Sequence, residues 1–262
     1  MTLYWHELKM NRLSFVVWFL GVASMCAFCI FLFPMMEESM SDLSDAFASM
    51  GSFSAAFGMD QLPITTLEGF FGTEIGTIYA LGGGMYAALL GIGALSKEES
   101  AHTAEFLHTL TLSRCGILTG KLAAIVTLLA AFGLLHYGVF VGASALIGES
   151  IDMKSLTLFT LAQSLCQLEL AAVCFALSAL SKRSGLGVGL GMALVLYVLD
   201  LVSRITDKAQ FLQYITPFSY ANATDIFVSQ GIEVIPACIG GGVTLLALAA
   251  AYFIYTKRDI AA

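Results

Sequence analysis

Residues 96–121, SKEESAHTAEFLHTLTLSRCGILTGK, decide how this chain is arranged. They form its longest charged stretch of helix-forming residues, and a long apolar run lies on each side. The stretch carries Lys97, Arg114 and Lys121, and basic loops between membrane spans face the cytoplasm. The sequence therefore predicts a cytoplasmic helical segment between two spans.

The composition is that of an integral membrane protein. The 262 residues are 58% hydrophobic and only 12% charged, whereas about 25% of the residues in a soluble domain are charged. The net charge of −7 argues against a nucleic-acid partner, which would need a basic surface. No polar stretch reaches the roughly 50 residues of a soluble domain, so we expect one membrane domain over residues 1–262.

Six apolar runs predict an all-α protein with six transmembrane helices, because about 20 residues cross a hydrocarbon core of about 30 Å. Pro34 is expected to end the first span. With both termini in the cytoplasm, nine of the 12 Lys and Arg residues fall on that side, and Lys154, Arg204 and Lys208 fall outside. The predicted spans are residues 13–33, 75–95, 122–147, 156–180, 185–203 and 234–255.

Three segments outside these spans also have predicted structures. Residues 1–12 combine interfacial aromatic and basic side chains and predict an interfacial helix. The acidic loop after Pro34 has an apolar stripe over residues 36–50, which favours a helix that rests on the outer membrane surface or caps the bundle over an outer gate. Residues 211–231, FLQYITPFSYANATDIFVSQG, are too apolar for a free loop, and we expect one or two short re-entrant helices covered by protein.

Ionisable side chains inside apolar spans are costly and mark candidate pathways. Glu169 lies near the middle of the fourth predicted span, with Gln163 and Gln167 nearby. A structural hydrogen bond and a path-lining role remain equally open for Glu169. His136 lies inside the third span, where a structural role is favoured. Asp200 lies near the outer end of the fifth span, where we expect it to be hydrated.

Other patterns in the chain predict packing or docking rather than catalysis. Glu98, His102, Glu105 and His108 share one helix face that could hold a metal, but a solvated or partner-facing helix is favoured. GILTGKL lacks the spacing of a phosphate-binding loop, so no nucleotide site is predicted. The glycines at 185, 187, 189 and 191 form two GxxxG pairs, which favour close helix packing.

The chain resembles the permease subunit of bacterial type-2 ATP-binding-cassette (ABC) exporters, which have a separately encoded ATPase. Glu7-Leu8-Lys9 with Arg12 is similar to the family's opening helix, and Thr216-Pro217-Phe218 to its outer re-entrant motif. His102 and Thr111 replace a Gly and a Pro that the family often has. The motif between spans two and three is matched by Thr103, Glu105, Leu107, Ser113, Arg114, Gly120 and Lys121.

The resemblance implies a dimer in the bacterial cell membrane, made with a second permease copy or a paralogue and surrounded by membrane lipid. Each subunit would dock an ABC ATPase that binds ATP and magnesium, while this chain itself binds no cofactor or metal and is not an enzyme. Amphipathic compounds such as antimicrobial peptides or drugs would be exported. The docking residues of the coupling helix would be Glu98, Glu99, His102, Thr103, Glu105, Phe106, Leu107 and Arg114. Path candidates are Glu169, Gln163, Gln167 and His136, and an outer gate would include Pro217 and Phe218.

Two other classes of protein remain as alternatives. An intramembrane metalloenzyme or protease is suggested by Glu98 and Glu99, although they fall on a predicted cytoplasmic loop rather than inside the bilayer. An ion-coupled secondary carrier would be built from two related repeats with broken, charged helices. One buried Glu169 and no clear repeat give that reading little support.

Overall fold

A computed structural model describes residues 2–48, 51–59, 61–100, 113–180 and 185–257, without the side chains of residues 2, 37–48, 52–53, 97–100 and 207. Within these ranges all regular secondary structure is helical. Six helical segments are long and apolar enough to cross a membrane, which confirms the predicted number of spans. They are Leu3–Met36, Leu67–Ser96, Arg114–Ile147, Met153–Leu180, Leu186–Ile205 and Val234–Lys257.

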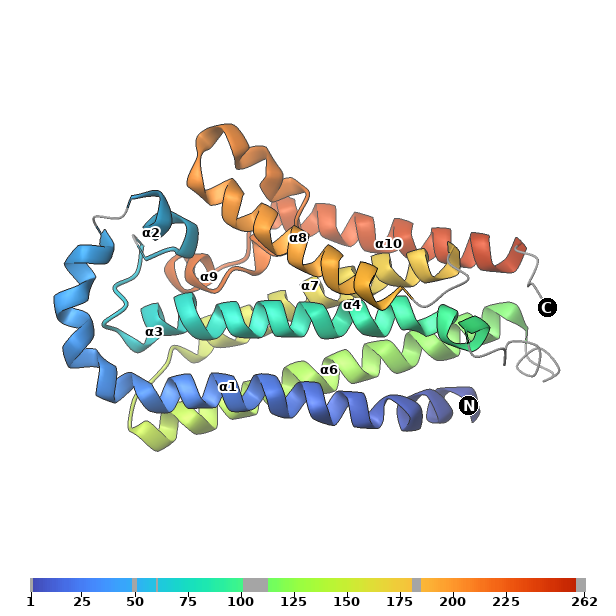
Figure 1. Cartoon of the computed structure of the whole chain (residues 1–262), viewed down its shortest axis with the longest axis horizontal. Helices are drawn as coiled ribbons and strands as arrows, with labels where there is room; N and C mark the ends of the chain where they lie inside the picture. Colours follow the sequence, from blue (N-terminus) through green and yellow to red (C-terminus); the bar gives the residue numbers. More distant parts are fainter. Residues whose placement is uncertain (1, 49–50, 60, 101–112, 181–184, 258–262) are drawn as a thin grey trace.

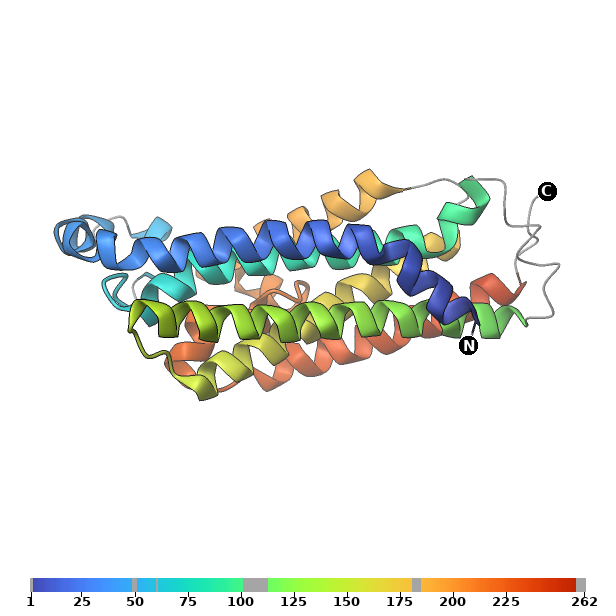
Figure 2. The same cartoon turned by 90° about the horizontal axis from the view of Figure 1, so that it is seen from below.

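The long helices form a bundle along one axis (Figures 1 and 2). The start of α1, the end of α4, the start of α6 and the end of α10 share one end of this bundle, here called the terminal end. The opposite end is called the far end. The assignment of the terminal end to the cytoplasm stays a prediction. The bounds are α1 Thr2–Ala48, α4 Gly76–Ser100, α6 Arg114–Ile147, α7 Met153–Leu180, α8 Leu186–Ile205 and α10 Val234–Lys257.

Pro34 does not end α1, contrary to the prediction, because the helix continues to Ala48. A proline removes one backbone donor and kinks a helix, but the hydrogen bonds on both sides of it can remain. Figure 1 shows α1 turning sharply at the far end of the bundle. Residues 2–12 also belong to α1, so the expected interfacial helix is continuous with the first span.

The second and third long helices begin at different residues from those predicted. The second span extends back through a π-helical turn, Phe71–Ile75, to α3 (Leu67–Phe70). Helix α6 begins at Arg114 instead of residue 122, because the Ser113 side chain caps it by accepting a hydrogen bond from the Gly116 amide (3.1 Å). Residues 114–121 are therefore part of the third long helix and not of a separate loop.

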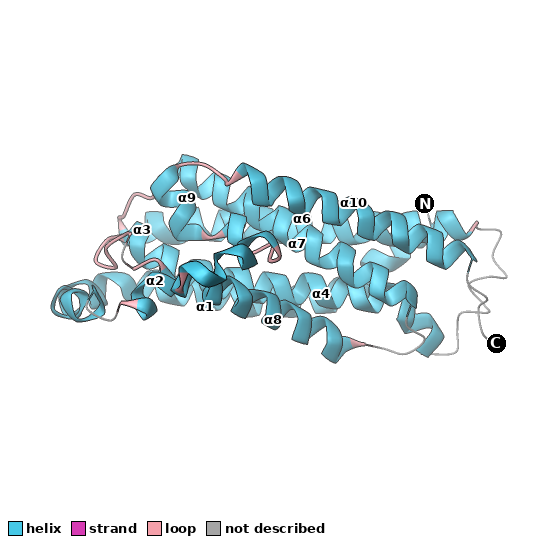
Figure 3. Ribbon diagram, turned by 90° about the horizontal axis from the view of Figure 1, so that it is seen from above, coloured by secondary structure: helices cyan, strands magenta, loops and turns pink. Residues whose placement is uncertain are grey.

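Helix α4 lies in the middle of the bundle and packs most extensively on α7 (Figure 3). A Cβ on Gly91 of α4 would lie 2.3 Å from the Ala171 carbonyl oxygen of α7, so only glycine fits there. Gly185, which precedes α8, and Gly189 of α8 both face Ile92 of α4, where an added Cβ would lie 3.3 and 2.9 Å from its side chain. The other predicted pair, at positions 187 and 191, has no neighbour within 4 Å. One of the two GxxxG pairs therefore packs inside the subunit.

Short helices precede the last span, as predicted. They are the 3-10 helices Asp207–Tyr214 and Ser219–Ala221 and the helix α9 (Ala223–Ser229), which Asn222 caps. Residues 216–221 are buried, so protein covers this irregular backbone. The short helix α2 (Ser52–Phe57) lies near α8 at the same end. Whether these segments enter a membrane stays a prediction.

Candidate functional site

A cluster of charged side chains lies at the far end, between α8 and α9. One guanidinium nitrogen of Arg204 lies 2.6 Å from a carboxylate oxygen of Asp225 on α9. The Arg204 Nε lies 3.2 Å from the Asp200 carboxylate, one turn earlier on α8. The side chains of Arg204, Asp200 and Asp225 are 13%, 3% and 26% exposed. These three residues, called the charge network below, join the fifth span to α9.

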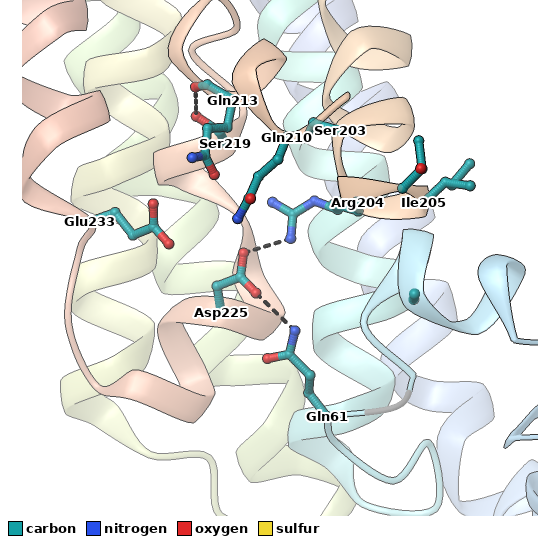
Figure 4. Close-up of a pocket in the computed structure, with 11 residues that line it drawn as sticks. Gln61, Ser203, Arg204, Ile205, Gln210, Gln213, Ser219, Asp225 and Glu233 are labelled. Carbon is teal, nitrogen blue, oxygen red and sulfur yellow. Dashed lines mark hydrogen bonds and ion pairs between the residues drawn. The ribbon is translucent and has the colours of Figure 1, made fainter. Parts of the chain in front are cut away.

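A polar pocket of about 450 Å³ lies beside the charge network (Figure 4). Figure 4 shows Gln210 and Glu233 entering the same space as Asp225 from different elements. Gln61 donates a hydrogen bond of 3.4 Å to the Asp225 oxygen that does not contact Arg204. The pocket can therefore accept a polar or charged group at one edge of the charge network.

The predicted gate residues Pro217 and Phe218 are buried, and they precede Ser219, which lines this pocket. The Thr216 hydroxyl donates a hydrogen bond of 2.8 Å to the Leu196 carbonyl of α8. The Phe218 ring packs edge-on against Tyr197, with 5.4 Å between ring centroids. This motif is thus anchored to α8, so any movement of it would have to involve the fifth span.

Glu169 lies where α7, α10 and the segment before the last span meet. Its side chain is buried and accepts a hydrogen bond of 3.0 Å from the Tyr220 hydroxyl. Burial raises the pKa of that hydroxyl, so it keeps the proton that it donates. A Cβ added to Gly240 of α10 would lie only 2.2 Å from the Glu169 carboxylate. Glu169 therefore makes a buried hydrogen bond, and glycine makes room for its carboxylate, while a path-lining role for Glu169 stays a prediction.

The other path candidates divide into two places. Gln163 donates a hydrogen bond of 2.8 Å to the Ala221 carbonyl and so joins the Glu169 region. Gln167 and His136 instead lie around Phe132, in an aromatic part of the core. The His136 Nδ1 lies 2.8 Å from the Phe132 carbonyl oxygen, and its ring packs 4.9 Å from that of Tyr79. His136 is fully buried, and the structural role favoured for it stays a prediction.

A buried ion pair joins α1 to α6 near the terminal end. The Lys121 Nζ lies 2.7 Å from a Glu7 carboxylate oxygen, and the two side chains are 1% and 5% exposed. A pocket of about 350 Å³ borders the pair and is lined by Asn11, Ser14 and apolar side chains of α4 and α6. Lys121 is therefore packed inside the bundle and is not a residue of a solvated cytoplasmic loop.

Arg114 of the predicted docking set lies at the start of α6, beside the end of α10. Its guanidinium donates hydrogen bonds of 3.4 and 3.2 Å to the carbonyls of Tyr255 and Thr256. A cation is favourable at the C-terminus of a helix, where carbonyl groups lack partners within the helix. Arg114 therefore holds two span helices together, whatever else it binds.

The structure does not describe the side chains of the other predicted docking residues. The side chains of Glu98 and Glu99, at the end of α4, are not described. His102, Thr103, Glu105, Phe106 and Leu107 fall outside the described residues altogether. Within the part of the chain that is described, no three His, Cys, Asp or Glu side chains come together as metal ligands.

The family comparison covers almost the whole chain. The family described as ABC-2 family transporter protein matches residues 1–260. The chain belongs to this family. No curated protein matches the chain in sequence. Family membership makes the chain a permease subunit of an ABC transporter, a multi-pass membrane component with an ABC ATPase as partner.

Sequence reasoning about this ABC-2 permease missed both buried ion clusters. Asp200 was expected to be hydrated, but it is buried and paired with Arg204, and the spacing of four residues on one helix was the available signal. Glu7 and Lys121 were each assigned to a surface segment. The signal for them was a charge beside a long apolar run on each of two helices, because such charges need partners in an apolar bundle.

Proposed function

We propose that this permease subunit exports amphipathic compounds, such as antimicrobial peptides or drugs, from the bacterial cell. A separate ABC ATPase, which binds ATP and magnesium, would supply the energy. The observation that carries this proposal is the family match over residues 1–260, together with the six-span bundle. The direction of transport and the substrate class go beyond family membership and are our inference.

The ATPase docks on the segment 96–121 in this proposal. Helix α4 ends within that segment, at Ser100, and α6 begins within it, at Arg114, both at the terminal end (Figure 1). Helix α6 also carries Arg114 and Lys121, which connect it to α10 and α1. A force applied at this segment would therefore act on four span helices, which supports a role in coupling.

A second permease copy or a paralogue covers part of the outer face of α8 in this proposal. That face exposes Val188, Val195 and Val202, and the open glycine positions 187 and 191 lie on the same helix. Small residues allow close approach of helices in a membrane. Substrate would pass along the interface between the two copies, and lipid would cover the remaining apolar surface.

The proposal is tested by purifying the chain with and without its candidate ATPase. We expect no ATP hydrolysis by the chain alone, and ATP-dependent movement of a fluorescent amphipathic cation or peptide when both are reconstituted in vesicles. Glu105→Arg should reduce ATPase assembly, whereas Glu149→Arg at the far end should not. ATP hydrolysis by the purified chain alone would contradict the proposal. Unchanged binding of the ATPase to the Glu105→Arg variant would contradict it as well.

A further inference from the structure

One oxygen in the centre of the bundle has no hydrogen-bond partner among the described residues. It is the Oε1 of Gln163, which is inaccessible to solvent, on a residue that is 1% exposed. The Nε2 of the same amide donates to the Ala221 carbonyl at 2.8 Å, so the orientation of the side chain is fixed. An unpaired buried acceptor is costly, and the large majority of buried polar groups in native proteins have a partner in the protein or an ordered water.

A small cavity borders this amide. Its volume is about 20 Å³, and a water molecule needs about 10–15 Å³. Asp200 of α8 lines the cavity together with Gln163, and Tyr197, Thr77 and Asn222 add polar groups. The cavity is therefore both polar and large enough for one water molecule, the two conditions that separate hydrated cavities from dry ones.

We propose that this cavity binds one ordered water molecule. The water donates one O–H to the Gln163 Oε1 and the other to the Asp200 carboxylate. Asp200 has room for that bond, because its contacts with Arg204 are 3.2 and 3.4 Å long and a carboxylate can accept about four hydrogen bonds. The water thereby connects α7 to the charge network of the far end.

Water fits the site better than a monovalent cation does. The Arg204 guanidinium already lies against Asp200, and a second positive charge beside it would be repelled. A bridging water also satisfies the neutral Gln163 oxygen without any change in charge. This inference does not depend on what the permease transports.

The sign of the stability change that one substitution causes tests the proposal. Ala80 of α4 lines the cavity, and Ala80→Val would fill it. Filling a dry cavity stabilises a protein, whereas displacing a bound water leaves the Gln163 oxygen without a partner and removes one hydrogen bond from Asp200. We therefore expect Ala80→Val to lower the thermal midpoint by a few degrees, and Ala80→Ser, which supplies a hydroxyl, to lower it less.

A second background separates hydration from simple overpacking. In the Gln163→Leu variant, which has no amide oxygen, Ala80→Val should lower the thermal midpoint much less than it does in the native chain. An equal fall in the thermal midpoint in both backgrounds, or a rise caused by Ala80→Val in the native chain, would overturn the proposal.

Direct observation completes the test. A structure at a resolution that shows ordered water should have one density peak within hydrogen-bond distance of the Gln163 Oε1. The thermal midpoint should be the same in sodium and in choline buffers of equal ionic strength. A thermal midpoint that depends on sodium would indicate that the cavity binds a cation instead of water and would overturn the proposal. The absence of a density peak at that resolution would also overturn it.

Discussion

The two ends of the permease hold their buried charges in different ways. At the terminal end, Glu7 and Lys121 form a pair that is almost completely enclosed. At the far end, Arg204 is shared between two carboxylates, and Asp225 remains partly exposed beside a pocket of about 450 Å³. Both sites border a pocket, but the side chains of the terminal pair are almost completely buried, whereas Asp225 of the charge network is 26% exposed.

The difference teaches where each end can rearrange. Separating a buried pair strands two charges in an apolar environment, so α1 and α6 should move as one unit. In the charge network, Arg204 can lose one partner and keep the other, and solvent can reach Asp225. We therefore expect relative helix movement at the far end and little at the terminal pair.

The largest effect should come from Lys121→Met. It removes the ammonium group that lies 2.7 Å from the buried Glu7 carboxylate, and such changes cost about 3–5 kcal/mol. The free energy of unfolding in detergent, measured by titration with a denaturing detergent, should fall accordingly. Lys154→Met, at an exposed lysine, is the matched control and should change it by less than about 0.5 kcal/mol.

The double variant Glu7→Leu with Lys121→Met should recover most of the loss, because two apolar side chains can replace a buried pair. A similar loss in the single and the double variant would mean that the pair is not what joins α1 to α6.

Arg204→Met should destabilise less, by about 2 kcal/mol, because it leaves one buried carboxylate, Asp200, whereas solvent already reaches Asp225. The same titration measures it. Asp225→Asn should cost less still, because Arg204 keeps Asp200 as a partner. If Arg204→Met cost as much as Lys121→Met, the contrast between the two ends would be wrong.

Gly240→Ala tests the contact between α7 and α10, midway between the two charged sites. Its Cβ would lie 2.2 Å from the Glu169 carboxylate, and overpacking costs about 1–3 kcal/mol. The expected loss is about 1.5 kcal/mol in the same titration. Gly241→Ala and Gly242→Ala are matched controls, because nothing lies within 4 Å of either position, and they should not destabilise.

Glu169→Ala should make Gly240→Ala tolerable, because it removes the carboxylate that the new methyl group would meet. A loss that persists in this background would show that α10 meets a different obstacle there.

The smallest effect should come from Arg114→Gln, which weakens the contact of α6 with the end of α10. Interactions of a cation with a helix C-terminus contribute about 0.3–1 kcal/mol. The thermal midpoint should therefore fall by only a few degrees. ATPase binding measured on the same sample sharpens the comparison: a large loss of binding with this small loss of stability would assign Arg114 to docking as well as to packing.

The span count could be predicted from the sequence because hydropathy and length carry it. The ends of the helices could not, since they depend on single groups. Ser113 starts α6 eight residues before the expected span, and Pro34 lies within α1 although prolines often end helices. At the start of α6 the hydrogen bond of one capping side chain outweighed the composition of the neighbouring residues.

The candidate site was partly predictable for a similar reason. Glu169 stood out because a carboxylate in an apolar span needs a partner, but its partner Tyr220 lies 51 residues away in an irregular segment. The partners Glu7 and Lys121 are 114 residues apart. Pairing across such separations depends on how the helices pack, which periodicity along one helix does not report.

The length of α6 has a mechanical consequence. Its 34 residues form a rod of about 51 Å, considerably longer than the roughly 30 Å of a hydrocarbon core. It contains no proline, and it is capped at both ends by Ser113 and Gly148. If the first turn of α6 tilts, its last turn should therefore be displaced in proportion to the length of the helix, because no proline kink lies between the two turns.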